Sequence, residues 1–131
     1  MATRERPLSP HLQVYRKQVQ MMTSITHRIT GVVLAVGILG LVYALVSLAA
    51  GPERWAGFVA CAGSLPGLLV LFGFSWALAY HFLNGVRHLA QDTGAGFAIP
   101  DFIRSSWISV FGSLILVALA WAFVLMRWGQ V

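Results

Sequence analysis

The sequence predicts an all-α integral membrane protein whose chain crosses the bilayer three times. Apolar residues make up 58% of its 131 residues and charged residues only 10%, against about 25% charged in a typical soluble chain. Three long stretches contain no Asp, Glu, Lys or Arg, namely 29–52, 55–86 and 105–126. Each exceeds the roughly 20 residues that a helix needs to cross about 30 Å of hydrocarbon.

The basic residues are distributed unevenly between the two ends of these stretches. Two lie on one side, Arg54 and Arg127, and seven lie on the other: Arg4, Arg6, Arg16, Lys17, Arg28, Arg87 and Arg104. The positive-inside rule therefore places the N-terminus in the cytoplasm and the C-terminus in the periplasm. The net charge of +5 reflects this topology, so we expect the lipid bilayer and no nucleic acid as a partner.

The first residues are polar and resemble neither a secretory signal nor the amphipathic, Ser-rich and Arg-rich transit peptide of a mitochondrial precursor. This favours a bacterial inner (cytoplasmic) membrane, with the mitochondrial inner membrane as the less favoured alternative. Cys61 is the single cysteine, which excludes a disulfide framework and a cysteine-based metal site within the chain.

Residues 1–22 are predicted to form a cytoplasmic N-terminal arm that precedes a transmembrane anchor domain, residues 23–128. Pro7 and Pro10 resist helix formation in the arm, and its apolar residues predict that it docks on a partner or on the membrane surface. The first helix is predicted at about 24–49, with Thr23 or Ser24 as its cap and a turn outside the membrane at residues 51–55.

The second helix is predicted at about 64–91, since Ser64 followed by Pro66 is typical of a helix start. Residues 93–96 end it, and Pro100 with Asp101 marks the next loop. The third helix is predicted at about 105–127. These boundaries bring the end of the second helix to the same side of the membrane as the start of the first.

Four residues near the end of the second helix share one helical face: His81, Gly85, His88 and Asp92. An ionisable group within hydrocarbon is a functional candidate, and His81 lies deepest in the membrane. Neutral imidazole is a good ligand for haem iron. His81 and His88 cannot ligate one iron from opposite sides because they lie on one face, and we expect His27 at the depth of His88. A second histidine ligand for an iron at His81 must then come from another polypeptide.

A second polar face lies at the start of the first helix, where Ser24, His27, Arg28 and Gly31 share the same spacing. It offers donors and positive charge to an acidic or carbonyl-bearing ligand. Helix capping with a snorkelling Arg28 is the alternative interpretation.

Several residues around His81 suit a flat macrocycle with acidic substituents. Gly85 removes a side chain where the macrocycle would lie, and the basic groups suited to its propionates are His27, Arg28 and His88. Asp92 suits either a proton path or a solvated helix end. Arg87 is interpreted as an interfacial residue or a partner contact, and neither Tyr80 nor Asn84 receives a role.

These residues resemble a known family, the cytochrome b large membrane anchor subunits of succinate dehydrogenase (respiratory complex II). The motifs that carry the resemblance, in chain order, are Arg6-Pro7-Leu8-Ser9-Pro10-His11-Leu12-Gln13-Val14-Tyr15, Ser24-x-x-His27-Arg28-x-Thr30-Gly31 and His81-x-x-x-Gly85-x-Arg87-His88-x-x-x-Asp92. The last predicted helix matches only as a hydrophobic span.

The resemblance implies half of a heterodimeric haem-binding helical bundle in a four-subunit complex. The partners would be a flavoprotein, an iron–sulfur subunit and a second small membrane anchor that supplies the other ligand of haem b. His81 matches the axial iron ligand, and Ser24 and Arg28 match residues of the ubiquinone site. The remaining matches are His27, Arg28 and His88 near the haem propionates and Asp92 on a proton path.

The chain itself has no flavin fingerprint and no cysteine cluster for an iron–sulfur centre. It is therefore expected to be an enzyme only as a subunit of the succinate dehydrogenase (quinone) complex, passing electrons from succinate to quinone. Two alternatives are a haem-free, quinone-binding anchor of the fumarate reductase type and a small helical transporter component. The second is disfavoured because the ionisable residues other than His81 lie at the membrane boundaries.

Overall fold

The computed structural model describes residues 16–128, and that part of the chain contains four α-helices and no strand. They are α1 (Val19–Ala49), α2 (Pro52–Ala62), α3 (Leu65–Asp92) and α4 (Ile99–Trp128). α1, α3 and α4 are long and apolar enough to cross a membrane. The predicted three-span, all-α fold is thus confirmed, whereas the predicted arm up to residue 15 lies outside the described residues.

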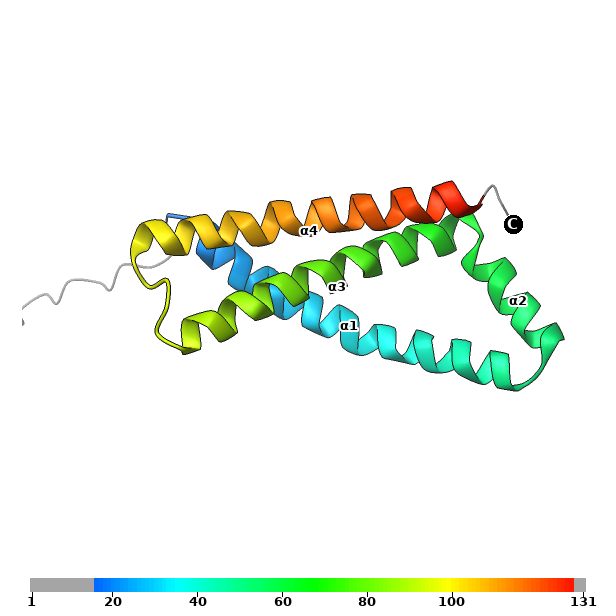
Figure 1. The fold of residues 1–131 in the computed structure, drawn as a ribbon. Coiled ribbons are helices and arrows are strands. Elements are labelled where there is room, and N and C mark those ends of the chain that lie inside the picture. Colours follow the sequence, from blue (N-terminus) through cyan, green and yellow to red (C-terminus); the bar gives the residue numbers. More distant parts are fainter. Residues whose placement is uncertain (1–15, 129–131) are drawn as a thin grey trace, which may run out of the picture.

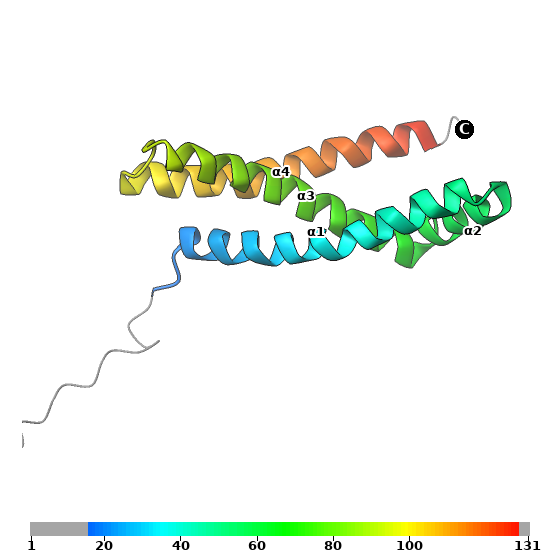
Figure 2. The same ribbon diagram turned by 90° about the horizontal axis from the view of Figure 1, so that it is seen from below.

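The three long helices do not form a parallel stack. α3 packs on both α1 and α4, and Figure 1 shows α1 and α3 crossing and then diverging, with α2 spanning the gap between their separated ends. The start of α1, the end of α3 and the start of α4 lie at one end of the molecule in both views (Figures 1 and 2). We call this the histidine end, because His27 and His88 lie near it.

Two helices begin earlier than the sequence predicted. α1 starts at Val19 with Gln18 as its N-cap, so the expectation of a cap at Thr23 or Ser24 is wrong. No Gly or Pro separates residue 19 from residue 24, and nothing there stops the helix from extending backwards. α4 starts at Ile99. Its Pro100 falls in the first turn, where the missing N–H costs nothing, so the loop predicted at this proline is the first turn of a helix.

α2 was not predicted, because residues 51–55 were expected to form a turn. Gly51 adopts a φ of +113°, which favours glycine, and Pro52 then occupies the first helical turn. The ring of Phe58 on α2 lies 6.0 Å from that of Tyr43 on α1, so α2 packs back on the span that precedes it. The predicted cap of the following helix is confirmed, since Ser64 Oγ accepts a hydrogen bond of 3.3 Å from the backbone N–H of Gly67.

The interior of the described chain is polar and its surface is apolar. Only three apolar or aromatic side chains are buried, whereas the buried polar and charged residues are nine: Thr23, Thr30, Ser47, Asn84, Arg87, Gln91, Ser106, Ser109 and Ser113. Leu, Val, Ile and Phe side chains instead cover the outside. This is the arrangement expected in lipid, where helices associate through small and polar residues because hydrocarbon gives no hydrophobic drive for contact between them.

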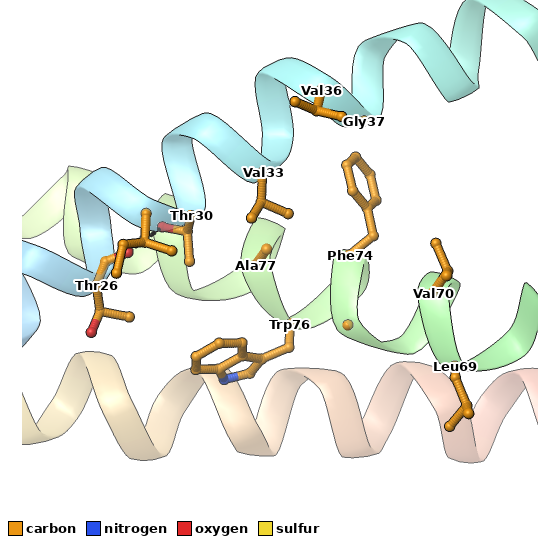
Figure 3. Close-up of a pocket in the computed structure, with 12 residues that line it drawn as sticks. Thr26, Thr30, Val33, Val36, Gly37, Leu69, Val70, Phe74, Trp76 and Ala77 are labelled. Carbon is orange, nitrogen blue, oxygen red and sulfur yellow. Dashed lines mark hydrogen bonds between the residues drawn. The ribbon is translucent and has the colours of Figure 1, made fainter. Parts of the chain in front are cut away.

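At one contact between α1 and α3 a glycine faces an aromatic ring. A Cβ atom at Gly37 would overlap the ring of Phe74, which points toward α1 in Figure 3. Beyond this contact the two helices diverge, and a Cβ atom at Gly40 would meet nothing within 4 Å. Gly37 therefore sets the spacing of α1 and α3, and Gly40 does not.

We predict that Gly37→Ala lowers the stability of the protein in detergent or lipid by about 1–3 kcal/mol, because the ring of Phe74 must move out of its packed position. Thermal unfolding followed by size-exclusion chromatography measures the effect. Gly40→Ala is the matched control and should leave the midpoint unchanged. Equal midpoints for the two variants would show that this contact does not limit helix packing.

Candidate functional site

His81 is held from α1 through one of its two ring nitrogens. Nδ1 lies 3.1 Å from the backbone carbonyl oxygen of His27 and 3.3 Å from Oγ1 of Thr30. A carbonyl oxygen can only accept, so Nδ1 carries the proton and donates it. The lone pair of the neutral ring is then on Nε2, which is the state in which imidazole binds a metal. α1 thus fixes the His81 ring through Nδ1 and leaves Nε2 out of these two contacts.

The side chain of His27 lies deeper than the sequence predicted. Its ring stacks on that of His81, with centroids 3.9 Å apart and planes at 10°, and lies 5.2 Å from the ring of His88. The expectation that no second histidine reaches the level of His81 is wrong. α1 begins at Val19, which places His27 about 12 Å along the helix instead of near its start.

This stacking does not give an iron two axial ligands. The stacked rings of His27 and His81 lie face to face in nearly parallel planes, so the two imidazoles are not directed at one iron from opposite sides. No group of three or more His, Cys, Asp or Glu residues that could hold a metal ion occurs within residues 16–128. A second ligand from another chain stays a prediction, now based on ring geometry instead of depth.

Two glycines leave room for these imidazole rings. A Cβ atom at Gly31 would lie 3.1 Å from Cε1 of His81, and one at Gly85 would lie 3.7 Å from Cε1 of His27. The space beside Gly85, predicted to clear a macrocycle, is therefore next to the His27 ring in this structure. Gly31 makes the tighter contact with the candidate ligand His81, a role that the sequence analysis did not assign to it.

The other predicted site residues lie around this cluster with different exposures. Ser24 and His88 are half-buried, whereas Arg28 and Asp92 are exposed. Ser24 and Arg28 lie on the same helical face of α1 as His27. Asp92 is the last residue of α3. The structure brings the three histidines into contact. The quinone-site role of Ser24 and Arg28 and the proton-path role of Asp92 stay predictions.

A second polar face of α3 points into the chain. Tyr80, Asn84, Arg87 and Gln91 repeat the spacing of the histidine face one residue earlier, and they are 2%, 0%, 7% and 9% exposed. The Tyr80 hydroxyl donates a 3.0 Å hydrogen bond to the backbone carbonyl of Thr23 on α1. Sequence reasoning assigned this face no function, although the repeated spacing of four, three and four was a signal that could have found it.

Arg87 links α3 to α4. Its Nη1 donates to Oδ1 of Asn84 at 2.9 Å and its Nε donates to Oγ of Ser105 at 3.1 Å. The guanidinium carbon also lies 4.6 Å from the centroid of the Phe102 ring, a cation–π distance. Because Arg87 is 7% exposed, the structure does not favour the predicted partner contact, whereas its predicted interfacial position stays a prediction. Together with Tyr80, Arg87 fixes the rotation of α3, so that the histidine face one residue on lies beside α1 and is only half-buried.

A cavity of about 630 Å³ lies between α1 and α3. Figure 3 shows Thr26 and Thr30 at one end, Val36, Gly37 and Leu69 toward the other, and the indole of Trp76 directed toward α4. None of the three histidines lines it. Its walls are otherwise mostly apolar, which suits a hydrocarbon chain, and it adjoins the histidine cluster through Thr30, whose Oγ1 contacts His81.

The family of the chain follows from its sequence over nearly its whole length. Residues 2–120 match the family described as "Succinate dehydrogenase/Fumarate reductase transmembrane subunit". The chain belongs to this family. The resemblance carried by the three motifs is thereby confirmed, and membership of a family of respiratory transmembrane subunits leaves the transporter alternative without support.

Curated members of this succinate dehydrogenase/fumarate reductase family are similar to the chain over most of their length. The "Succinate dehydrogenase cytochrome b556 subunit" of Paracoccus denitrificans is 44% identical over 87% of this chain and 88% of its own, and that of Rickettsia prowazekii is 38% identical over 89% and 91%. The mitochondrial "Succinate dehydrogenase cytochrome b560 subunit" of Mus musculus is 35% identical over 88% and 67%. Relatives thus occur in both bacteria and mitochondria.

We predict that Tyr80→Phe lowers stability by about 0.5–1.5 kcal/mol, because a buried hydrogen bond between α3 and α1 is lost while the packing of the ring is kept. Tyr43→Phe is the matched control, since Tyr43 is 64% exposed. Thermal midpoints of the two variants in the same detergent measure the difference. A Tyr80→Phe midpoint equal to the control would contradict a structural role for this bond.

Proposed function

We propose that the chain is the membrane-anchor cytochrome b subunit of a succinate:ubiquinone oxidoreductase. In this proposal His81 binds the iron of haem b, and Ser24 and Arg28 form part of the site at which ubiquinone is reduced. The observation that carries it is the orientation of His81, whose Nδ1 is occupied by α1 and whose Nε2 is left for a metal. The names of the relatives, which are succinate dehydrogenase cytochromes, support it.

The residues of the histidine face fit a haem. The carbonyl of His27 and the hydroxyl of Thr30 would hold the His81 ring in one tautomer and one orientation, as metal-bound histidines require. His27, Arg28 and His88 would hold the propionates with positive charge and N–H donors. Gly85 would leave room for the macrocycle. When bound, haem b supplies a centre that accepts and returns one electron at a time.

The exposure of the same face supports a partner in the membrane. His27, His81 and His88 are only half-buried and Arg28 is exposed, so part of the site is left uncovered by the described chain. A second small anchor subunit that brings the other axial histidine would cover it. A flavoprotein and an iron–sulfur subunit would carry out succinate oxidation, since this sequence has one cysteine and no flavin fingerprint.

Ubiquinone reduction would take place at the cytoplasmic boundary. The charge distribution predicts that the histidine end faces the cytoplasm, and Arg28 is exposed there. Ser24 would donate a hydrogen bond to a quinone carbonyl, and Arg28 would stabilise the negative charge that develops on its oxygen as electrons arrive. Asp92, at the aqueous end of α3, would belong to the path by which protons reach the quinone.

The second candidate is a haem-free quinone-binding anchor of the fumarate reductase type, which the family description also covers. The contact of His81 Nδ1 with the His27 carbonyl oxygen favours the haem protein, because it leaves Nε2 able to bind a metal. An anchor that binds quinone without iron does not need such a nitrogen within hydrocarbon. A reduced-minus-oxidised spectrum of the purified complex decides between the two, and the absence of a b-type band would leave the haem-free anchor.

We predict that His81→Ala abolishes or strongly alters haem binding, because the iron loses an axial ligand. Haem content per complex and the reduced-minus-oxidised spectrum measure this. His88→Ala is the control on the same face and should retain the b-type band, since it removes only a propionate contact. An unchanged haem spectrum and content in His81→Ala would refute the ligand assignment.

We predict that Arg28→Ala lowers ubiquinone reduction by succinate roughly 100-fold or more, as expected for loss of one stabilising donor. Succinate oxidation by a soluble artificial acceptor, which bypasses the membrane subunits, should change little. Arg104→Ala removes an exposed arginine at the same end and should affect neither assay. Equal losses in the two assays would count against a quinone site at Arg28.

A further inference from the structure

Arg87 is a buried cation that the proposed function leaves unused. Its side chain is 7% exposed, and both groups that accept its hydrogen bonds, the Asn84 amide and the Ser105 hydroxyl, are neutral. Its third nitrogen, Nη2, is buried and has no partner within residues 16–128. The contacts described for Arg87 therefore hold the guanidinium in place without neutralising its charge.

No carboxylate within residues 16–128 forms a recorded ion pair with this guanidinium, whose hydrogen-bond acceptors are Asn84 and Ser105. The acidic residues of this part of the chain are Glu53, Asp92 and Asp101, and all three are exposed; Glu53 lies on α2, away from the histidine end. Two further buried donors on the same face of α3, Asn84 Nδ2 and Gln91 Nε2, also have no partner among the described residues. The inner face of α3 is thus positive in potential next to the histidine end.

The position of this charge relates it to the candidate haem ligand. Arg87 follows His81 by six residues, which is about 9 Å along a helix, and it immediately precedes His88. Electrostatic interactions in a protein interior are screened far less than in water. A fixed positive charge at this distance favours any nearby group that gains an electron, because the added negative charge is stabilised.

We propose that Arg87 raises the reduction potential of the haem held by His81, acting as a permanent internal cation positioned by Asn84, Ser105 and Phe102. This inference rests on the proposed function, since the haem is the group that receives the electron. Removing one charge at about 10 Å changes the reduction equilibrium roughly tenfold at an effective dielectric constant of about 20. For a one-electron couple a tenfold change corresponds to about 59 mV.

The experiment compares haem midpoint potentials in the intact purified complex by redox titration of the b-type band. Arg87→Gln removes the charge and keeps a polar side chain. Ser105→Asp leaves Arg87 in place and puts a carboxylate next to its Nε. It therefore neutralises the charge of the guanidinium without removing a buried side chain. Arg87→Lys keeps the charge, and Arg104→Gln removes an exposed arginine at the same end as a control.

The inference predicts a roughly tenfold shift toward the oxidised haem in both Arg87→Gln and Ser105→Asp, with Arg87→Lys closer to the wild type and Arg104→Gln unchanged. If Arg87→Gln does not assemble, Ser105→Asp decides alone. A wild-type potential in Ser105→Asp, or an equal shift in Arg104→Gln, overturns the inference. A wild-type complex without haem b overturns the proposed function instead, so the two failures are distinguishable.

Discussion

The burial of polar side chains of α3 against α1 and α4 is the constraint on which the rest of the structure depends. In hydrocarbon a helix gains nothing by hiding leucine, so its rotation is set by the groups that lipid cannot satisfy. Tyr80 anchors α3 to α1, and Arg87 anchors it to α4. The histidine face, one position further along α3, is thereby placed beside α1, where His81 and His88 are half-buried.

The histidine face consequently differs from an ordinary lipid-facing surface. Its two histidines are half-buried, and both contact His27 of α1. α1 contributes a carbonyl and a hydroxyl to the His81 ring, and a glycine where a side chain would push the ring aside. Chemistry and packing are thus divided between two adjacent faces of one helix, and α1 contacts both.

Hydropathy and charge predicted the three spans correctly because length and composition alone decide whether a helix can cross a bilayer. Helix ends were less predictable. α2 and α4 each begin with a proline in the first turn. α1 begins early because no Gly or Pro stops the helix before Ser24. The depth of His27 was missed for the same reason. A helix that begins at Val19 instead of Ser24 places His27 about two turns inside it and not in its first turn. The role of Arg87 depends on the partner helix, which periodicity in α3 alone does not reveal.

The one-residue offset between the two faces of α3 has a consequence for how this segment can change over evolutionary time. A substitution at one helical position changes only the contacts of that position. A single inserted or deleted residue upstream of Tyr80 within α3 is different, because it rotates everything that follows by about 100°. A deletion would turn Arg87 toward lipid and put the histidines in the packed interior, whereas an insertion would put Arg87 where His88 now lies and turn the histidines toward lipid. The length of this helix is therefore under stronger constraint than most of its individual residues.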